Sequence, residues 1–275
     1  MILLQKRSRD LYPGGDLSLD RNYAEWAVTR GSLEKQVYDI EAKVEAEHWW
    51  FAGRRQLFAN EIARAKISRS SLVLDVGIGG GSNLRMLAEI EFTHVIGLDP
   101  NLDVVHICQD KGFASVQQGS ICDLPFSSES FGFVLATDVI EHVQDVMAAL
   151  KEIYRVLRPG GYALITVPAF QSLWGLQDKV ALHCRRYRLG TLVERVISAK
   201  LTIVRSYYFN YLLFAPIWTA RKIVSLTGIR LQSENDVNSP LLNRVMTKIF
   251  RFDIVTAPLL RPPFGVSALV VARKV

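Results

Sequence analysis

The sequence is poor in cysteine, with three among 275 residues and no Cys-X-X-Cys pair. This odd number without metal-binding spacing fits neither a disulfide framework nor a zinc site, so we expect reduced thiols and no bound metal ion. No run of 18 consecutive apolar residues occurs, which speaks against a transmembrane helix. The short apolar stretch 1–4 precedes the first basic residues, the reverse of a secretory signal. We therefore expect a cytoplasmic protein, either free or peripheral at the cytosolic face of a membrane.

Glycine, proline and charge are also modest, with 18 Gly, 10 Pro and 22% charged residues against 49% hydrophobic ones. These values exclude collagen-like, disordered and coiled-coil chains. The length is too great for a small domain and short for two average ones, which favours one large domain or one domain with an insertion.

Acidic residues are scarce in the C-terminal third. Residues 183–275 contain 15 Lys and Arg against 4 Asp and Glu, whereas residues 1–182 contain 18 against 23. A surplus of positive charge in one part of a chain indicates an anionic partner for that part. Composition alone does not distinguish a phosphorylated substrate from a membrane surface or a nucleic acid.

Hydrophobic periodicity gives the organisation of the chain. Residues 1–32 show no sustained period, which predicts a flexible N-terminal arm, and three- and four-residue spacing predicts helices over 33–67. Short apolar strands then alternate with amphipathic helices, which indicates a parallel sheet covered on both faces. The expected strands are 72–76, 94–98, 114–118, 131–137, 162–167, 201–209 and 266–272, and the expected helices are 82–90, 102–111, 145–157 and one after Gly190.

The most informative motif is a glycine-rich loop after the first expected strand. Gly77, Gly79 and Gly81 follow Asp75, but Ser82 stands where a dinucleotide-binding loop has its third glycine. A carboxylate at Asp75 would repel a pyrophosphate and attract a cation, so we expect a positively charged ligand. Asp99 ends the next strand, the position that hydrogen-bonds a ribose diol in doubly wound folds.

Further motifs complete a family pattern. They are Leu-Pro-Phe at 124–126, Phe-Gly-Phe-Val-Leu-Ala-Thr-Asp-Val-Ile-Glu-His-Val at 131–143 and Leu-Arg-Pro-Gly-Gly at 157–161. Together with the loop and Asp99, they make residues 47–274 resemble a class I S-adenosylmethionine-dependent methyltransferase of the small-molecule, type 11-like group. The resemblance implies an α/β, Rossmann-like fold: a seven-stranded, mostly parallel sheet with helices on both faces and an antiparallel last strand. Residues 33–275 would form one domain, with a helical lid at 33–67 and a helical insertion at 207–255.

The resemblance also assigns a cofactor, S-adenosyl-L-methionine, which leaves as S-adenosyl-L-homocysteine. The three loop glycines would pack against its methionine part, Asp75 would attract its positive charge, and Asp99 would bind the ribose. Ser120 and Ile121 would flank the adenine, although the family often has Asp in place of Ser120, so the amino contact could pass to Asp123 or a backbone carbonyl. Further candidates are Asp138, which would face the sulfonium or cap a helix, and Arg54 or Arg55, which would bind the carboxylate or remain solvated.

Candidate acceptor residues follow the fourth and fifth strands. If the acceptor is a hydroxyl, a general base is needed, and His142 and His183 are the candidates, with a structural role for His142 as the alternative. A segment after the fifth strand resembles a signature of methyltransferases near glycan and lipid biosynthesis and could grip an anionic acceptor or be a solvated basic turn. Its residues are Trp174, Asp178, His183, Arg185, Arg186 and Tyr187.

Aromatic and basic residues crowd 207–222, which fits a helix at a membrane interface, a dimer contact or acceptor lid, or core packing. The leading interpretation is a methyltransferase for a small-molecule, sugar or lipid-linked acceptor, acting by in-line O-methylation. Nucleic-acid methylation ranks below it, because the Pro-Pro-aromatic motif of base methyltransferases is missing after the fourth strand, where Asp138-Val-Ile stands. A non-catalytic S-adenosylmethionine-binding scaffold is the third alternative.

Overall fold

The computed structural model describes residues 48–227 and 239–275. The predicted N-terminal arm 1–32, the first part of the predicted lid at 33–47 and the middle of the predicted insertion at 228–238 lie outside the described residues.

A single seven-stranded sheet organises the described chain, with the strand order β3-β2-β1-β4-β5-β7-β6. The neighbouring strands from β3 to β5 run parallel, and β7 runs antiparallel to both β5 and β6. This confirms the mostly parallel sheet and its antiparallel last strand. The strands are β1 (Val73–Val76), β2 (Val95–Asp99), β3 (Val116–Gln118), β4 (Phe131–Thr137), β5 (Leu157–Pro168), β6 (Thr202–Phe209) and β7 (Ser267–Arg273).

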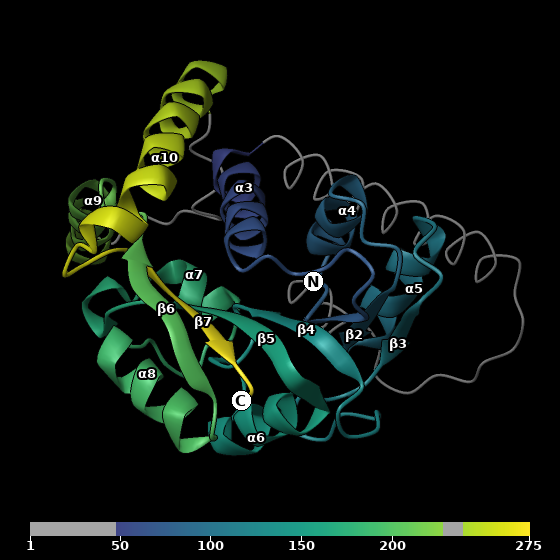
Figure 1. Cartoon of the computed structure of the whole chain (residues 1–275). Helices are drawn as coiled ribbons and strands as arrows, with labels where there is room; N and C mark the ends of the chain where they lie inside the picture. The colour runs from purple at the N-terminus through teal and green to yellow at the C-terminus, as the bar shows by residue number, and fades with distance from the viewer. Residues whose placement is uncertain (1–47, 228–238) are drawn as a thin grey trace, which may run out of the picture.

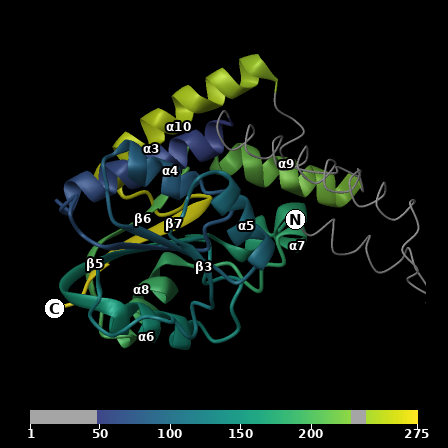
Figure 2. The ribbon, with the colours of Figure 1, turned by 90° about the vertical axis from the view of Figure 1, so that its right-hand side faces the viewer.

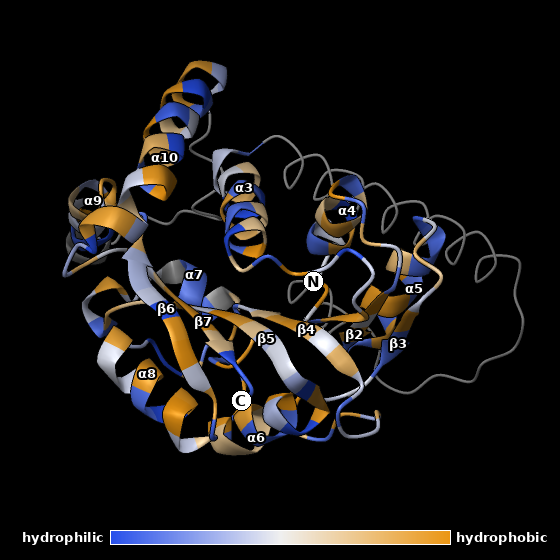
Figure 3. Cartoon of the chain, viewed as in Figure 1, coloured by the Kyte–Doolittle hydropathy of each residue, from blue (hydrophilic) through white to orange (hydrophobic). Residues whose placement is uncertain are grey.

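Helices cover both faces of the sheet (Figure 1). Helices α6 and α8 pack on one face, and α3, α4 and α10 pack on the other, each face with its own apolar cluster. Figure 3 shows the apolar colouring gathered on the strands, with polar residues on the outer helix faces. The helices are α3 (Trp49–Arg64), α4 (Ser82–Glu89), α5 (Leu102–Asp110), α6 (Val146–Val156), α7 (Leu176–Val180), α8 (Leu189–Ser198), α9 (Phe214–Thr227) and α10 (Pro240–Leu260), with a 3-10 turn at Gln171–Leu173.

Local sequence sets several of the boundaries. Asp145 begins α6 by accepting a hydrogen bond from the Ala148 amide at 2.9 Å, and Asn101 caps α5 in the same way. Ser239 caps α10, and Pro240 occupies its first turn, where the missing N–H costs nothing. β4 is buried along its whole length, as expected for a strand inside a parallel sheet.

Helix α3 is firmly docked onto the sheet, on the side that α10 also covers (Figure 2). Buried Glu61 accepts hydrogen bonds from Arg205 and Tyr207 of β6, at 2.8 and 3.0 Å. Gly53 lies so close to Phe250 of α10 that a Cβ atom at position 53 would stand 2.1 Å from the ring. The described half of the predicted lid is therefore a packed layer of the fold.

The main differences from the sequence prediction concern the start of β5 and the bounds of the insertion. Strand β5 begins at Leu157, so the Pro-Gly-Gly segment lies inside the strand, where we expected a turn before residue 162. Residues 207–209 belong to β6, in agreement with the strand expected at 201–209, so the insertion expected from residue 207 begins later. Its helical part runs from Phe214 to Leu260, with its middle outside the described residues. No helix in the described ranges is both long enough and apolar enough to span a membrane.

Candidate active site

The carboxyl ends of β1 and β4 form the centre of the candidate site. These neighbouring strands continue into connections on opposite sides of the sheet, because β1 is followed by β2 and β4 by β5. Such a switch point leaves a crevice outside the strand ends, and ligands of doubly wound folds bind there. Asp75, Asp99 and Asp138 all lie at or just after strands at this edge.

The glycine loop between β1 and α4 has a backbone that requires glycine at Gly77. Its φ is +73°, and a Cβ atom there would stand 2.6 Å from Cγ2 of Val139 in the segment after β4. Gly79 and Gly81 also have positive φ, at +50° and +85°. The loop therefore runs tightly past the end of β4 and leaves backbone close to the crevice.

Asp75 has one carboxylate oxygen bonded and one without a partner. Oδ1 accepts a hydrogen bond from the Asn83 side chain at 3.1 Å, whereas Oδ2 has no partner among the described residues. Burial, together with the nearby Asp99, raises the pKa of Asp75 to about 7, although the Asn83 hydrogen bond and Arg54 act in the opposite direction. A buried carboxylate of this kind is stabilised by a cationic ligand group.

Asp99 is held rigidly at the end of β2. Its two carboxylate oxygens accept hydrogen bonds from the backbone amides of Asn101, at 2.9 Å, and of Gly79, at 3.4 Å. Burial raises the pKa of Asp99, and these two amides oppose the shift. The carboxylate thus joins the glycine loop to the strand end and has lone pairs left for the two hydroxyls of a ribose.

Asn83 is a site residue that sequence analysis missed. Besides Asp75, its amide donates to the Thr137 hydroxyl at 3.0 Å, so it ties α4 to the ends of β1 and β4. Its place in the first turn of the helix after the loop was the only signal, and polar residues are common in first turns.

Asp138 is engaged by an arginine and does not cap a helix. It adopts φ of +56°, forms an ion pair with Arg54 at 2.9 Å and accepts a hydrogen bond from Thr166 at 3.0 Å. The helix-cap alternative is wrong, because the next helix, α6, begins only at Val146 and is capped by Asp145. The Arg54 guanidinium also lies over the rings of Trp50 and Phe58, and Arg55 donates to the Ser82 hydroxyl.

The adenine candidates lie beyond β3. The Ser120 hydroxyl accepts a hydrogen bond from the Cys122 amide at 3.2 Å, and Ile121 is buried in the core. The structure places both in the segment after the third strand end, as the sequence predicts, and their contact with a nucleobase stays a prediction.

The two candidate bases lie side by side although 41 positions separate them in the chain. The ring centroids of His142 and His183 are 4.7 Å apart, in an edge-to-face arrangement. His142 lies in the turn between β4 and α6. Burial lowers the pKa of His142, and the neighbouring His183 lowers it further. The lowered pKa of His142 favours its neutral imidazole, the form that a general base requires.

Asp178 is the hub of the predicted acceptor segment. It is fully buried and accepts hydrogen bonds from the Gly175 amide, from His183 Nδ1 at 2.9 Å and from Arg186 at 2.7 and 3.0 Å. Although burial would raise its pKa, the hydrogen bonds from His183 and Arg186 hold the pKa of Asp178 well below its usual range. The Asp178 carboxylate therefore stays negatively charged and orients the His183 ring.

The remaining acceptor candidates do not meet at one anion-binding point. Arg186 is turned onto Asp178 and the Ala169 carbonyl, and the buried Tyr187 hydroxyl donates to the Ile140 carbonyl. Arg185 lies at the surface beside Gln144, and Trp174 is half-buried. In this structure Asp178 and backbone carbonyls already occupy Arg186 and Tyr187, and the predicted binding of one anion by all these groups stays a prediction.

The doubly wound sheet has a glycine loop and two acids, Asp75 and Asp99, at its switch point. This arrangement fits a positively charged nucleoside derivative. Residues 74–165 match the model of a methyltransferase-domain family. Residues 74–165 therefore form part of a methyltransferase domain.

Two related proteins are also named as methyltransferases. The chain is 32% identical to a probable S-adenosylmethionine-dependent methyltransferase of Mycolicibacterium smegmatis over 123 residues, which cover 44% of this chain and 46% of that protein. It is 34% identical to the tRNA (carboxymethyluridine(34)-5-O)-methyltransferase of Macaca fascicularis over 130 residues, 45% of this chain and 18% of that protein. The chain thus spans less than half the length of either relative.

A solved structure shares the fold. Phosphoethanolamine N-methyltransferase 2 of Haemonchus contortus, in complex with S-adenosyl-L-methionine, superposes with a TM-score of 0.53 at 18% identity. The match covers 80% of this chain and 52% of that one.

Proposed function

We propose that this chain binds S-adenosyl-L-methionine and transfers its methyl group to an oxygen atom of a small-molecule, sugar or lipid-linked acceptor. The observation that carries the cofactor half is the buried Oδ2 of Asp75, which has no partner among the described residues and lies behind a loop built from glycines with positive φ. The residues at this crevice fit the cofactor, because they offer acceptors for a ribose and a negative charge for a cation.

The chain's residues would hold the cofactor at three points. Asp99 would accept from the ribose hydroxyls, and the glycine loop would pass along the methionine part. Asp75 would stabilise positive charge at the end of β1, with Asn83 fixing its orientation. When bound, S-adenosyl-L-methionine supplies an electrophilic methyl group on a positively charged sulfur. Most of the rate enhancement then comes from aligning the acceptor oxygen in a site that excludes water.

The preference for an oxygen acceptor rests on the paired histidines. A hydroxyl must lose its proton as the new bond to carbon forms, and the His142 imidazole, whose pKa is lowered toward the neutral form, interacts with Asp138 and lies against the His183 ring. Asp178 orients the His183 ring through Nδ1, which leaves Nε2 for contact with the acceptor side. This arrangement is suited to activating a hydroxyl, which an amine acceptor would not require.

A lipid-linked acceptor is favoured by the outer face of α10. Residues Leu241, Val245, Phe252, Val255 and Leu259 repeat at three-, four- and seven-residue spacing and are all exposed, between 45% and 77%. Lys248 lies on the same face, and the exposed Arg244 and Arg251 flank it. The single acidic residue of α10, Asp253, is buried.

We call this face the α10 surface. An apolar helix face bordered by cations fits the interface of an anionic bilayer, where the apolar side chains enter the acyl region and the cations meet headgroups. Two independent views show α10 running along the outside of the molecule (Figures 1 and 2). A membrane surface would therefore bring a lipid-linked acceptor to the same protein that holds the methyl donor.

A tRNA acceptor is the second candidate, favoured by the named tRNA methyltransferase among the relatives and by the basic C-terminal third. Five exposed aliphatic and aromatic side chains on the α10 surface speak for lipid, because nucleic-acid surfaces rely on phosphate contacts from Lys and Arg.

Transfer of a radiolabelled methyl group from S-adenosyl-L-methionine tests the proposal. The protein is incubated separately with a membrane lipid extract, a mixture of soluble metabolites and sugars, and total tRNA. We expect base-resistant label in the lipid or metabolite fraction, as an ether requires, and about tenfold or greater loss of label with Asp99→Ala. If only tRNA is labelled, the acceptor is RNA and not a small molecule or lipid. If no fraction is labelled by a protein that binds the cofactor, the result supports the non-catalytic scaffold.

A further inference from the structure

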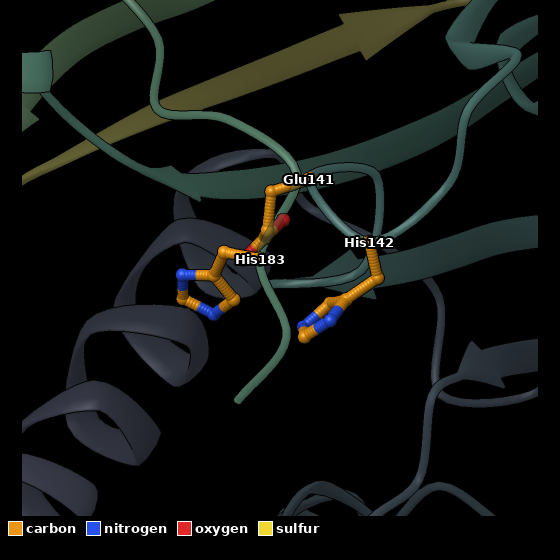
Figure 4. A group of neighbouring side chains, drawn as sticks. All are labelled: Glu141, His142 and His183. Carbon is orange, nitrogen blue, oxygen red and sulfur yellow. The ribbon is translucent and has the colours of Figure 1, made fainter. Parts of the chain in front are cut away.

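Three potential metal ligands converge next to the cofactor crevice. Glu141 and His142 come from the turn after β4, and His183 comes from the segment after α7 (Figure 4). One ligand atom from each side chain lies within 4.8 Å of the other two. In a tetrahedral zinc site the ligand atoms stand roughly 3.4 Å apart, so small side-chain rotations would bring these atoms to coordinating positions.

Of these three residues, Glu141 has the environment that a bound cation would stabilise most. Its side chain is fully buried, and neither carboxylate oxygen has a hydrogen-bond partner among the described residues. Two arginines approach this region, but Arg54 is paired with Asp138 and Arg186 with Asp178. Removing a carboxylate from water without a hydrogen bond or counter-charge costs several kcal/mol, and metal coordination is one of the ways in which proteins offset that cost.

His183 is already oriented as a metal ligand would be. Its Nδ1 is bonded to the buried carboxylate of Asp178 at 2.9 Å, which leaves Nε2 as the available nitrogen. Metal-bound histidines usually have such a carboxylate behind the ring, because it fixes the tautomer and raises the basicity of the coordinating nitrogen. Arg186 and the Gly175 amide hold Asp178 itself in place.

We infer that Glu141, His142 and His183 form a binding site for one divalent first-row transition-metal ion. Two imidazoles and one carboxylate are the donor set of many zinc and non-haem iron sites, whereas magnesium and calcium prefer oxygen ligands throughout. Three protein ligands leave coordination positions for water or for an acceptor oxygen. The inference reverses the expectation of no metal ion, which rested on cysteine spacing alone.

This inference deepens the proposed function but does not depend on it for its test. If the acceptor oxygen binds the metal ion, then His142 and His183 act as ligands and the ion lowers the pKa of the acceptor hydroxyl. The cofactor residues Asp75 and Asp99 are not among the three ligands. Metal binding and cofactor binding can therefore be measured separately.

Titration of the untagged, chelator-treated protein with Zn²⁺ or Co²⁺ alone tests the site. We expect one ion per chain by calorimetry, with visible absorption bands of Co²⁺ typical of nitrogen and oxygen ligands. Glu141→Gln and His183→Gln each should weaken binding about 100-fold, and Asp178→Asn about 10- to 100-fold through the orientation of His183. His106→Gln, a change at an exposed histidine of α5, is the matched control and should bind like the wild type.

Two results of the same titrations would contradict the proposed metal site. Absence of stoichiometric binding by the folded wild type would overturn the inference, as would equal binding by wild type and Glu141→Gln. Circular dichroism and binding of S-adenosyl-L-homocysteine show whether each variant is folded. Metal binding without cofactor binding would refute the proposed function and keep the metal site, and the reverse result would refute the metal site alone.

Discussion

At the scale of single residues, Asp75 lies in β1 just before the glycine loop and favours a cationic ligand over a pyrophosphate. Its carboxylate is fully buried, and burial raises its pKa to about 7. A folded-state pKa above the unfolded one means that the folded chain holds an extra proton between the two values. Stability therefore falls as the pH rises through this window.

Replacing Asp75 by Asn should remove this pH dependence. Between about pH 5 and pH 8 the free energy of unfolding of Asp75→Asn should rise relative to wild type by about 2–3 kcal/mol, because the amide has no charge to bury. Urea denaturation of the cofactor-free proteins across this range measures the difference. Parallel stability curves would mean that Asp75 titrates normally. The same variant should bind S-adenosyl-L-methionine more weakly at pH 8.

Gly77 is the loop glycine with the least room for a side chain. Gly77→Ala would place a methyl group 2.6 Å from Val139 at a positive φ, whereas Gly79→Ala meets no atom within 4 Å. We expect Gly77→Ala to cost about 2–4 kcal/mol of stability and Gly79→Ala about 1 kcal/mol, the cost of the backbone conformation alone. Thermal unfolding of the two variants makes the comparison, and equal losses would show that Val139 simply moves aside.

At the scale of elements, the crossing of α3 over α10 depends on a missing side chain. The Trp50 ring stacks on Phe250 at 5.4 Å, and Gly53 permits that approach. Gly53→Ala should destabilise the fold by about 1–3 kcal/mol through overpacking. Gly190→Ala in α8 has open space and should stabilise by up to about 1 kcal/mol. Chemical denaturation of both variants tests this pair, and a gain in stability for Gly53→Ala would refute the close crossing.

The α10 surface gives the second prediction at this scale. The double variant Phe252→Glu, Leu259→Glu should lose binding to phosphatidylglycerol-containing vesicles, because it removes apolar area and adds negative charge. Ile197→Glu changes an equally exposed apolar residue on α8 and should leave binding unchanged. Vesicle sedimentation at low and high salt measures both. Unchanged sedimentation of the double variant would show that α10 does not meet the membrane.

Sequence periodicity was sufficient to predict most helices and strands but not the residues at which they begin and end. The alternation of strands and helices through β4 and α6 is predictable because each element carries its own apolar pattern. The start of β5 was not predicted because proline and glycine usually mark turns in a sequence. In this protein Pro159, Gly160 and Gly161 lie within the strand. The short α7, with five residues, carries too little periodicity to be recognised.

At the scale of the whole molecule, residues distant in sequence meet at one edge of the sheet. The glycine loop and Asp99 were predictable because they belong to contiguous motifs at strand ends. The neighbourhood of His142 and His183, and the turning of Arg186 onto Asp178, were not, because they depend on how the segment after β5 folds back over β4. Buried ion pairs between loops leave no periodic signal in a single sequence.

The molecule therefore combines the proposed methyl-donor site at the switch point with the cationic and apolar outer face of α10. Asp75, the glycine loop, Asp99 and His142 lie within the matched range 74–165, whereas His183 and α10 lie beyond it. Acceptor choice is accordingly expected to reside in the C-terminal third and in the histidine pair, and methyl-donor binding in the sheet.

The central claim is that the β1–β4 edge binds S-adenosyl-L-methionine, and calorimetric titration of the purified protein with this cofactor and with S-adenosyl-L-homocysteine tests it most directly. Wild type should bind one molecule per chain, and Asp99→Ala should bind at least about tenfold more weakly, a loss of about 1.4 kcal/mol. Asp103→Ala, at an exposed acid of α5, should bind like wild type. No binding by the folded wild type, or equal binding by Asp99→Ala, would contradict the account.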